Sequence, residues 1–181
     1  MDRKLLNSEL GRISAEEYSK AAASGLVLVM DNVRSAHNVG SAFRSGDAFH
    51  VDKLLLCGIS PRPGSAELHK TALGAEQTVP WEYFDSTTKA VDALRAEGYV
   101  IVSVEQTRNS VSLEKFVPVK GKKYALIFGN EVAGVQQEVV DASDFSLEIP
   151  QFGTKHSLNV SVSVGIVLWQ ASFLFKDALA K

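Results

Sequence analysis

The sequence predicts an α/β domain with a mostly parallel sheet flanked by helices, and two observations carry this prediction. Short apolar runs recur along the 181 residues, and segments of helical length and pattern lie between them. Several runs are continuously apolar rather than alternating, which is typical of strands that helices cover on both faces. Strands that alternate with helices in this way form parallel sheets.

Six segments are expected to be strands, and four segments between them are expected to be helices. The strands are residues 26–30 (LVLVM), 53–58 (KLLLCG), 78–84, 98–106, 123–130 and 145–150. The helices are residues 38–49, 65–73, 86–97 and 136–142. Helix 86–97 has the clearest signals, because Ser86 can cap its start, apolar residues follow at helical spacing, and Gly98 comes directly after its end.

The last apolar segment, residues 158–175, is ambiguous by pattern alone. LNVSVSV alternates as a strand does, whereas GIVLWQASFLF suits a helix. Its length approaches that of a membrane span, but polar residues interrupt it. We therefore expect a helix that is buried all round, by its own domain and by a partner subunit. Residues 1–181 are expected to form a single domain, with a short helical extension over about the first 25 residues.

Composition excludes several classes of protein. Cys57 is the single cysteine, so no intramolecular disulfide framework and no four-cysteine zinc site can form, and the four histidines lack metal-ligand spacing, so no metal is expected. The charged N-terminus does not resemble a signal peptide, which favours the cytoplasm. The net charge of -2 argues against a protein that coats nucleic acid through bulk charge. A local basic patch or scattered surface charges could be formed by Arg34, His37, Arg44, Arg62, His69 and Lys70.

The first stretch with chemical content is DNVRSAHNVGSAFRSGDAFHV, residues 31–51. It places two glycines in a helix, where each costs about 1 kcal/mol relative to alanine. Gly46 falls in the apolar stripe, so we expect close packing of the helix on the sheet. Gly40 falls near Arg44 on the polar side, where a bare backbone would let a ligand approach beside the guanidinium. The alternative for Arg44 is a surface ion pair with Asp47.

The second stretch is LIFGNEVAGV, residues 126–135, in which a buried strand runs into a turn with Gly129, Glu131 and Gly134. In open α/β sheets ligands bind beyond the carboxyl ends of the strands, and glycine there lets a cofactor approach the main chain. The stretch is not a phosphate loop, because no lysine follows the second glycine. The alternative for Glu131 is an exposed carboxylate in a turn.

The third stretch, EIPQFGTKHSLNVSVSVG at residues 148–165, again joins a strand to a glycine-bearing loop and a helix. Lys155 and His156 give this loop a basic character. The alternatives are that Ser157 caps the helix and that Asn159 bonds its first turn. Three such loops are expected to meet at one edge of the sheet, and no Ser-His-Asp triad, paired carboxylates or metal cluster competes with them.

Taken in order, NVGSAFRSGDAF, FGNEVAG and IPQFGTKHSLNVSVSVG resemble the three motifs of the SpoU (TrmH-like) branch of the SPOUT RNA methyltransferases. The resemblance spans residues 31 to about 169. It implies a deep trefoil knot in the C-terminal third, S-adenosylmethionine as cofactor and a homodimer formed through the C-terminal helix. It also implies methyl transfer to a ribose 2′-hydroxyl of RNA, with tRNA favoured over rRNA and with no role for DNA or a membrane.

The resemblance assigns roles to particular positions. It implies a catalytic set made of Arg44, Asn38, Glu131, Ser157 and Asn159. It implies a cofactor-binding set made of Val104, Gly129, Ile149 and Leu158. The short segment before the first strand leaves no room for a separate RNA-binding domain, so substrate capture is expected to rest on the domain itself, its terminal helices and the partner. Transfer to a base nitrogen, a non-catalytic dimeric RNA-binding module, and a small-molecule enzyme of doubly wound type are the alternatives.

Overall fold

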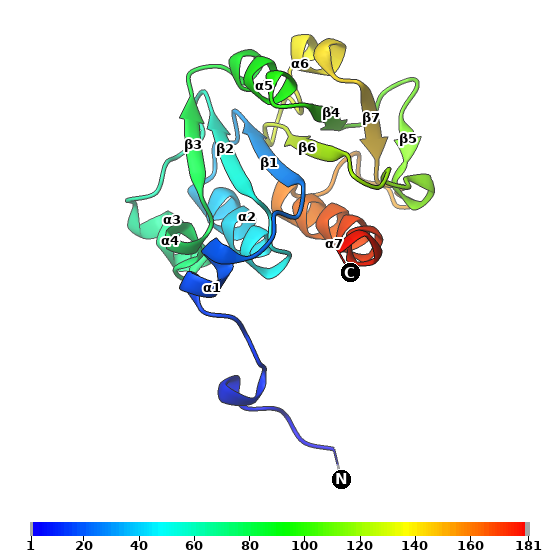
Figure 1. The fold of residues 1–181 in the computed structure, drawn as a ribbon. Coiled ribbons are helices and arrows are strands. Elements are labelled where there is room, and N and C mark those ends of the chain that lie inside the picture. The colour runs from blue at the N-terminus through cyan, green and yellow to red at the C-terminus, as the bar shows by residue number, and fades with distance from the viewer. Residues whose placement is uncertain (1, 180–181) are drawn as a thin grey trace.

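The computed structural model describes residues 2–179, and side chains through residue 172. Its centre is a seven-stranded sheet in which every pairing is parallel, in the order β3-β2-β1-β6-β4-β7-β5 (Figure 1). The strands are β1 Leu26–Asp31, β2 Lys53–Cys57, β3 Trp81–Phe84, β4 Tyr99–Val104, β5 Val111–Ser112, β6 Lys123–Phe128 and β7 Phe145–Glu148. The predicted α/β class and parallel sheet are confirmed.

Helices cover both faces of this sheet. On one face lie α1 Ala15–Lys20, α2 Ala36–Ala48, α3 Ala66–Ala72, α4 Ala75–Thr78 and α7 Val160–Leu179. On the other face lie α5 Thr87–Ala96 and α6 Gln137–Ala142 (Figure 1). Each face therefore has its own hydrophobic core, and the molecule has three layers.

The central strand β1 shows why the apolar runs are continuous. Leu28 and Met30 point into the core beneath α2 and α7, whereas Val27 and Val29 point into the core beneath α5 and α6. All four side chains are fully buried. A strand between two helical layers has no solvent face, so alternation with polar residues disappears.

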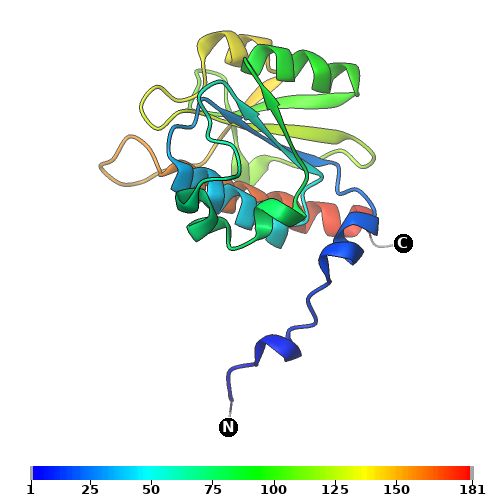
Figure 2. The same ribbon diagram turned by 90° about the vertical axis from the view of Figure 1, so that its left-hand side faces the viewer.

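The structure differs from the predicted elements in three places. The third strand begins at Trp81 rather than at residue 78, because α4 occupies the preceding residues. Strand β5 was not predicted, since two residues carry no periodic pattern. Before β1 the chain forms the short 3₁₀ helix η1, Asn7–Glu9, and then α1, and the segment around η1 extends away from the body (Figures 1 and 2).

Most of segment 158–175 is helical, because it lies in α7, which begins at Val160. The core buries Val164, Val167 and Leu168, but Val162, Ile166 and Trp169 remain on an exposed apolar face, 36–57% accessible. The rest of the domain therefore covers only one side of α7. That a partner subunit covers the other side stays a prediction. The side chains of residues 173–175 lie outside those described. Among the described residues, no helix has both the length and the apolar character needed to cross a membrane. The trefoil knot also stays a prediction.

Candidate cofactor cleft and catalytic network

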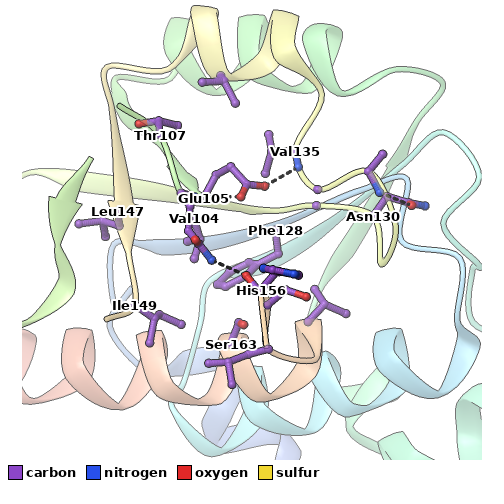
Figure 3. Close-up of a pocket in the computed structure, with 18 of the residues that line it drawn as sticks. Val104, Glu105, Thr107, Phe128, Asn130, Val135, Leu147, Ile149, His156 and Ser163 are labelled. Atoms are coloured by element: carbon purple, nitrogen blue, oxygen red, sulfur yellow. Dashed lines mark hydrogen bonds between the residues drawn. The ribbon is translucent and has the colours of Figure 1, made fainter. Parts of the chain in front are cut away.

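The carboxyl ends of β4, β6 and β7 open into a cleft of about 1000 Å³ (Figure 3). Strand order places it where a ligand is expected, because β1, β2 and β3 run outward in one direction while β4 and β7 lie on the other side of β6. Apolar side chains from these strand ends and from the start of α7 form part of its wall: Val104, Phe128, Leu147, Ile149, Leu158 and Val160. Three loops complete the cleft, through residues 105–109, residues 129–135, and Gln151 with residues 156–158.

All four predicted cofactor-binding positions line this cleft. Val104 ends β4, Gly129 follows β6, Ile149 follows β7, and Leu158 precedes α7. Three loops that are far apart in the sequence therefore converge at one edge of the sheet. The second and third predicted stretches supply two of them, but the loop after β4 is the remaining one, because no residue of the first stretch, 31–51, lines the cleft. The apolar wall suits a flat aromatic group, and the loop main chain supplies polar groups beside it.

Glycine is required at two positions of the second loop, Gly129 and Gly134, for different structural reasons. A Cβ atom on Gly129 would collide with the backbone of Gly134 and Val135, so the strand can turn this tightly only at a glycine. Gly134 has a φ of +69°, a left-handed conformation that favours glycine, and its own Cβ would collide with the carboxylate of Glu105. Asn130 and Gly134 close the loop with two backbone hydrogen bonds of 3.0 and 2.9 Å.

Two adjacent residues at the end of β4, outside the three motifs, join the other loops. Glu105 Oε2 accepts the Val135 N–H at 2.9 Å, while its Oε1 accepts the Gln106 N–H at 2.9 Å (Figure 3). The side-chain amide of Gln106 donates to the His156 carbonyl at 2.8 Å. Glu105 thus holds the second loop in position, and Gln106 holds the third loop. Neither residue was predicted as functional, and the available signal was a polar pair directly after a buried strand at the carboxyl edge.

Three of the five predicted catalytic residues form one hydrogen-bond network. Glu131 Oε1 accepts from the Asn38 side-chain amide at 2.9 Å, and Asn38 Oδ1 accepts from the Asn159 amide at 3.2 Å. Glu131 also accepts the backbone N–H groups of Arg34 and Ser35 at 2.9 and 3.0 Å. The first, second and third motifs therefore meet through their side chains.

The electrostatics of Glu131 follow from these donors. Partial burial alone would raise its pKa, but the Arg34 N–H, the Asn38 amide and the Ser35 N–H favour the charged form and hold the pKa below the ordinary value. Glu131 is therefore an ionised acceptor that orients α2. Glu131 is an exposed residue in a turn, as the alternative expected, but its carboxylate is also bound by three N–H donors.

Arg44 lies apart from this network within the chain. It is exposed on α2, does not line the cleft, and forms no hydrogen bond or ion pair with the described residues, Asp47 included. Six residues separate it from Asn38, which is about 9 Å along the helix and about 120° around it. Its guanidinium is therefore presented on the outer face of the domain.

The two glycines of α2, Gly40 and Gly46, were expected to have different roles, and only the expectation for Gly46 is confirmed. Gly46 is confirmed as a packing position, because its Cβ would lie 2.9 Å from Val51 and 3.1 Å from Leu54. The expectation for Gly40 is wrong. A Cβ there would collide with the Thr71 hydroxyl and the Leu68 carbonyl, so this glycine lets α3 pack closely and offers no backbone to a ligand.

Ser157 lines the cleft, and its hydroxyl makes no hydrogen bond within the described part of the chain. It does not cap α7. Asn159 does so instead, because its Oδ1 accepts the Ser161 N–H at 2.9 Å, which confirms its expected bond to the first turn. Asn159 therefore holds both the helix and, through Asn38, the first motif.

The six basic residues considered for a patch are all at least partly exposed. Arg62 stacks on Tyr83 at 4.6 Å from the ring centroid, and His69 Nδ1 pairs with Glu76 at 2.5 Å. Arg34 and Lys70 form no ion pair with the described residues. The set lies on α2, on α3, which packs against α2, and on the loops beside these helices.

A buried carboxylate supports the cleft from behind. Asp31, at the end of β1, is fully buried and accepts from the Thr87 hydroxyl at 2.6 Å, the Asn32 amide at 2.9 Å and the Gln136 N–H at 2.8 Å. The Asn130 side chain donates to the Asn32 carbonyl at 2.7 Å. The second loop is thereby anchored at both ends, to β1 and to β4.

The fold and the cleft define a parallel α/β domain with a cleft among three converging loops. The model of the SpoU rRNA methylase family matches residues 25–169. The chain belongs to that family, so the resemblance seen in the three motifs is confirmed.

Individual relatives agree with this assignment. The chain is 32% identical over 147 residues to the 23S rRNA (guanosine-2′-O-)-methyltransferase RlmB of Neisseria meningitidis. This alignment covers 79% of this chain and 56% of that protein. It superposes on the crystal structure of the A. aeolicus TrmH/SpoU tRNA modifying enzyme with a TM-score of 0.78 and 26% identity, covering 90% of this chain and 83% of that one.

The AdoMet-bound rRNA methyltransferase from Sinorhizobium meliloti gives a TM-score of 0.75 at 26% identity, covering 83% of this chain and 59% of that one. The chain spans a little over half the length of both the N. meningitidis relative and the S. meliloti protein.

Proposed function

We propose that this protein is an S-adenosylmethionine-dependent RNA methyltransferase that transfers a methyl group to a ribose 2′-hydroxyl. The observation that carries the proposal is the hydrogen-bond network that joins Asn38, Glu131 and Asn159 beside a cleft of cofactor size. Names of the relatives, which describe guanosine-2′-O-methylation and an AdoMet-bound enzyme, support it. The same network disfavours transfer to a base nitrogen and a degenerate, non-catalytic RNA-binding module.

The residues of the cleft fit S-adenosylmethionine. Ile149 and Leu158 offer an apolar wall for the adenine, and the turn at Gly129 offers main-chain groups without an intervening side chain. Val104 closes the wall from β4. When bound, this cofactor supplies an electrophilic methyl group on a sulfonium.

The polar residues have the task of activating a poor nucleophile. Ser157, whose hydroxyl is available at the cleft, is placed to bond the ribose. Asn38, Glu131 and Asn159 hold the first and third motifs in register, so that the incoming hydroxyl meets a fixed geometry, a positioning effect worth several kcal/mol. Arg44 stabilises the developing alkoxide and holds phosphate. It is not the general base, because a guanidinium keeps its proton and has no lone pair to accept another.

A homodimer completes this site. Arg44 is exposed on the outer face of α2, and α2 packs against α7, whose own exposed apolar face carries Val162, Ile166 and Trp169. Covering that face with a second copy would remove a large apolar surface from water. A twofold axis there would bring Arg44 of one subunit to the cleft of the other. We place the assembly in the cytoplasm.

The favoured substrate is tRNA. The chain superposes on the tRNA modifying enzyme over 90% of its own residues with a TM-score of 0.78, compared with 83% and 0.75 for the rRNA methyltransferase from Sinorhizobium meliloti. Ribosomal RNA is the second candidate, because the family and two of these relatives carry that description.

Nucleoside analysis tests the proposal. Transfer RNA and ribosomal RNA from cells lacking this protein are digested, and 2′-O-methylated nucleosides are compared with the wild type by mass spectrometry. We expect the loss of one 2′-O-methylnucleoside from tRNA, restored in vitro by the purified protein with S-adenosylmethionine. Loss from rRNA alone would reassign the substrate, and loss of a base-methylated nucleoside instead would refute ribose transfer.

A further inference from the structure

Two apolar side chains stand almost completely in solvent on the loops that border the cleft. Phe152, in the third loop, is 97% exposed, and Val132, in the second loop, is 91% exposed. They are the most exposed large apolar residues in the described part of the chain. Figure 2 shows both loops, yellow and orange, projecting from the same side of the domain. A phenylalanine so placed gains nothing for the fold of this chain.

The two loops are held in this position by hydrogen bonds. Asn130 Oδ1 accepts the N–H groups of Val132 and Ala133 at 2.9 and 3.2 Å, which fixes the tip of the second loop. The Gln106 amide holds the third loop at the His156 carbonyl. The tip that carries Val132 is therefore constrained, and the third loop is held four residues after Phe152.

Basic residues lie on or near these loops. Lys155 and His156 share the third loop with Phe152, Arg34 lies beside the second loop, and Arg108 lines the cleft; none forms an ion pair with a described residue. Glu131 and Glu105 lie at the same cleft, and each carboxylate accepts only N–H donors that carry no formal charge. The basic side chains are therefore free to pair with phosphate groups, although two carboxylates share their surroundings.

We propose that Phe152 is a stacking platform for an unpaired base of the RNA substrate, with Val132 as a second apolar contact at the cleft mouth. This inference rests on the proposed function and names the form of RNA that the site takes. Proteins recognise unpaired nucleotides by stacking their bases on aromatic side chains while cations hold the phosphates. An exposed ring on the loop that carries Lys155 and His156, next to a cleft that must receive a ribose, meets these requirements. The substrate is therefore a loop or bulge rather than a continuous helix.

A substitution series at Phe152 tests the stacking role. Phe152→Ala should weaken binding of bulk tRNA, taken from a strain lacking this protein, by roughly 5- to 100-fold. Phe152→Trp and Phe152→Tyr should bind within about twofold of the wild type, and Phe152→Leu should fall between, because leucine is apolar but cannot stack. The affinity for S-adenosylmethionine, measured by calorimetry without RNA, should be unchanged throughout. Val117→Ala, at a surface position 72% exposed, is the matched control and should bind tRNA as the wild type does.

Several outcomes would overturn the inference. Equal tRNA binding by the wild type and Phe152→Ala would refute it while leaving the proposed function intact, provided that both methylate RNA. Conversion of the dimer to a monomer by Phe152→Ala, seen by light scattering, would assign the ring to a subunit interface. Equal binding by the Leu, Trp and wild-type proteins would show a non-specific apolar contact. A wild type that neither binds nor methylates any RNA would overturn both proposals.

Discussion

The side chains of Asn38 and Glu131, 93 residues apart in the sequence, are joined by a hydrogen bond of 2.9 Å. The bond links the start of α2 to the loop after β6, and the backbone N–H groups of Arg34 and Ser35 reinforce it. Two segments that each carry part of the site are thereby fixed to one another. The carboxylate matters here as an acceptor, which makes its charge testable.

Glu131→Gln should lower stability at neutral pH by roughly 1 kcal/mol, because an amide presents only one acceptor oxygen to three donors and the site is exposed. The pKa of Glu131 is lowered in the folded state, so its contribution is complete above the ordinary glutamate pKa of about 4.3 and is lost as the pH falls through the lower folded value. Urea denaturation should show the difference between the two proteins at pH 6 and a smaller one at pH 3.5. A difference independent of pH would contradict an ionised acceptor.

The glycines of α2 give a second prediction. Gly46→Ala should cost about 1–3 kcal/mol through overpacking against Val51 and Leu54. Gly40→Ala should cost at least as much, since its Cβ meets the Leu68 carbonyl, which is backbone and cannot rotate away. Ser41→Ala, on the same helix, is the control and should stay within about 0.5 kcal/mol of the wild type. Thermal denaturation of the three variants measures the order of their stabilities. A Gly40→Ala variant as stable as the wild type would mean that α3 does not pack closely on α2 at this position.

The case of Gly40 shows what the sequence could and could not predict. Helical periodicity places Gly40 only about 40° from Arg44, so a shared polar face was a reasonable expectation. Periodicity gives the direction of a residue but not the element that lies there, and α3 occupies that side. The strands were predictable because a short, continuously apolar run such as that of β1 is typical of a strand covered on both faces. Convergence of the three loops followed from the parallel order, since the carboxyl ends of parallel strands share an edge.

Glu105 and Gln106 were missed for a related reason. They extend an apolar strand, and their role appears only once the partners are known, the Val135 N–H and the His156 carbonyl. No local pattern can reveal bonds across 30 and 50 residues. Arg44 is the opposite case, because the motif singled it out and the single chain leaves it outside the cleft.

Gln106→Ala should weaken S-adenosylmethionine binding by about threefold to tenfold, the effect of losing one hydrogen bond that positions the third loop. Glu105→Gln should have a similar effect through the second loop, because the Gln106 and Val135 N–H groups bond to different oxygens of the carboxylate and an amide has only one oxygen. Calorimetry measures both affinities. Gln77→Ala, on the exposed side of α4, is the control and should bind as the wild type does. Unchanged affinity in Gln106→Ala would show that the third loop holds its position unaided.

Ile166→Glu should convert the proposed dimer to a monomer, because it places a charge in the apolar face of α7 that a second copy would bury. The residue is already 36% exposed, so the variant should fold with a melting temperature within a few degrees of the wild type. Sedimentation measures the mass. Val117→Glu, on another exposed apolar position, should leave the mass unchanged. A dimeric Ile166→Glu protein would place the interface elsewhere.

Mixing two inactive variants decides whether Arg44 acts in its own subunit or across the twofold axis. Arg44→Ala should abolish methyl transfer while leaving S-adenosylmethionine binding near normal, because the residue lies outside the cleft of its own chain. Ser157→Ala should also reduce transfer strongly, by removing the hydroxyl that lines the cleft.

If Arg44 serves the partner, a heterodimer of these variants contains one site with both Arg44 and Ser157 intact and one site that lacks both. Equal mixing makes half of the dimers hybrid, so about a quarter of the wild-type activity should return. If Arg44 serves its own subunit, every site in the mixture lacks one of the two groups and no activity returns. Dissociating and reassociating the subunits before the assay ensures exchange, and a mixture that includes Ile166→Glu should show no recovery, because that variant cannot form the hybrid. Full inactivity of the exchanged mixture would place the guanidinium in its own cleft and require α2 to move toward it.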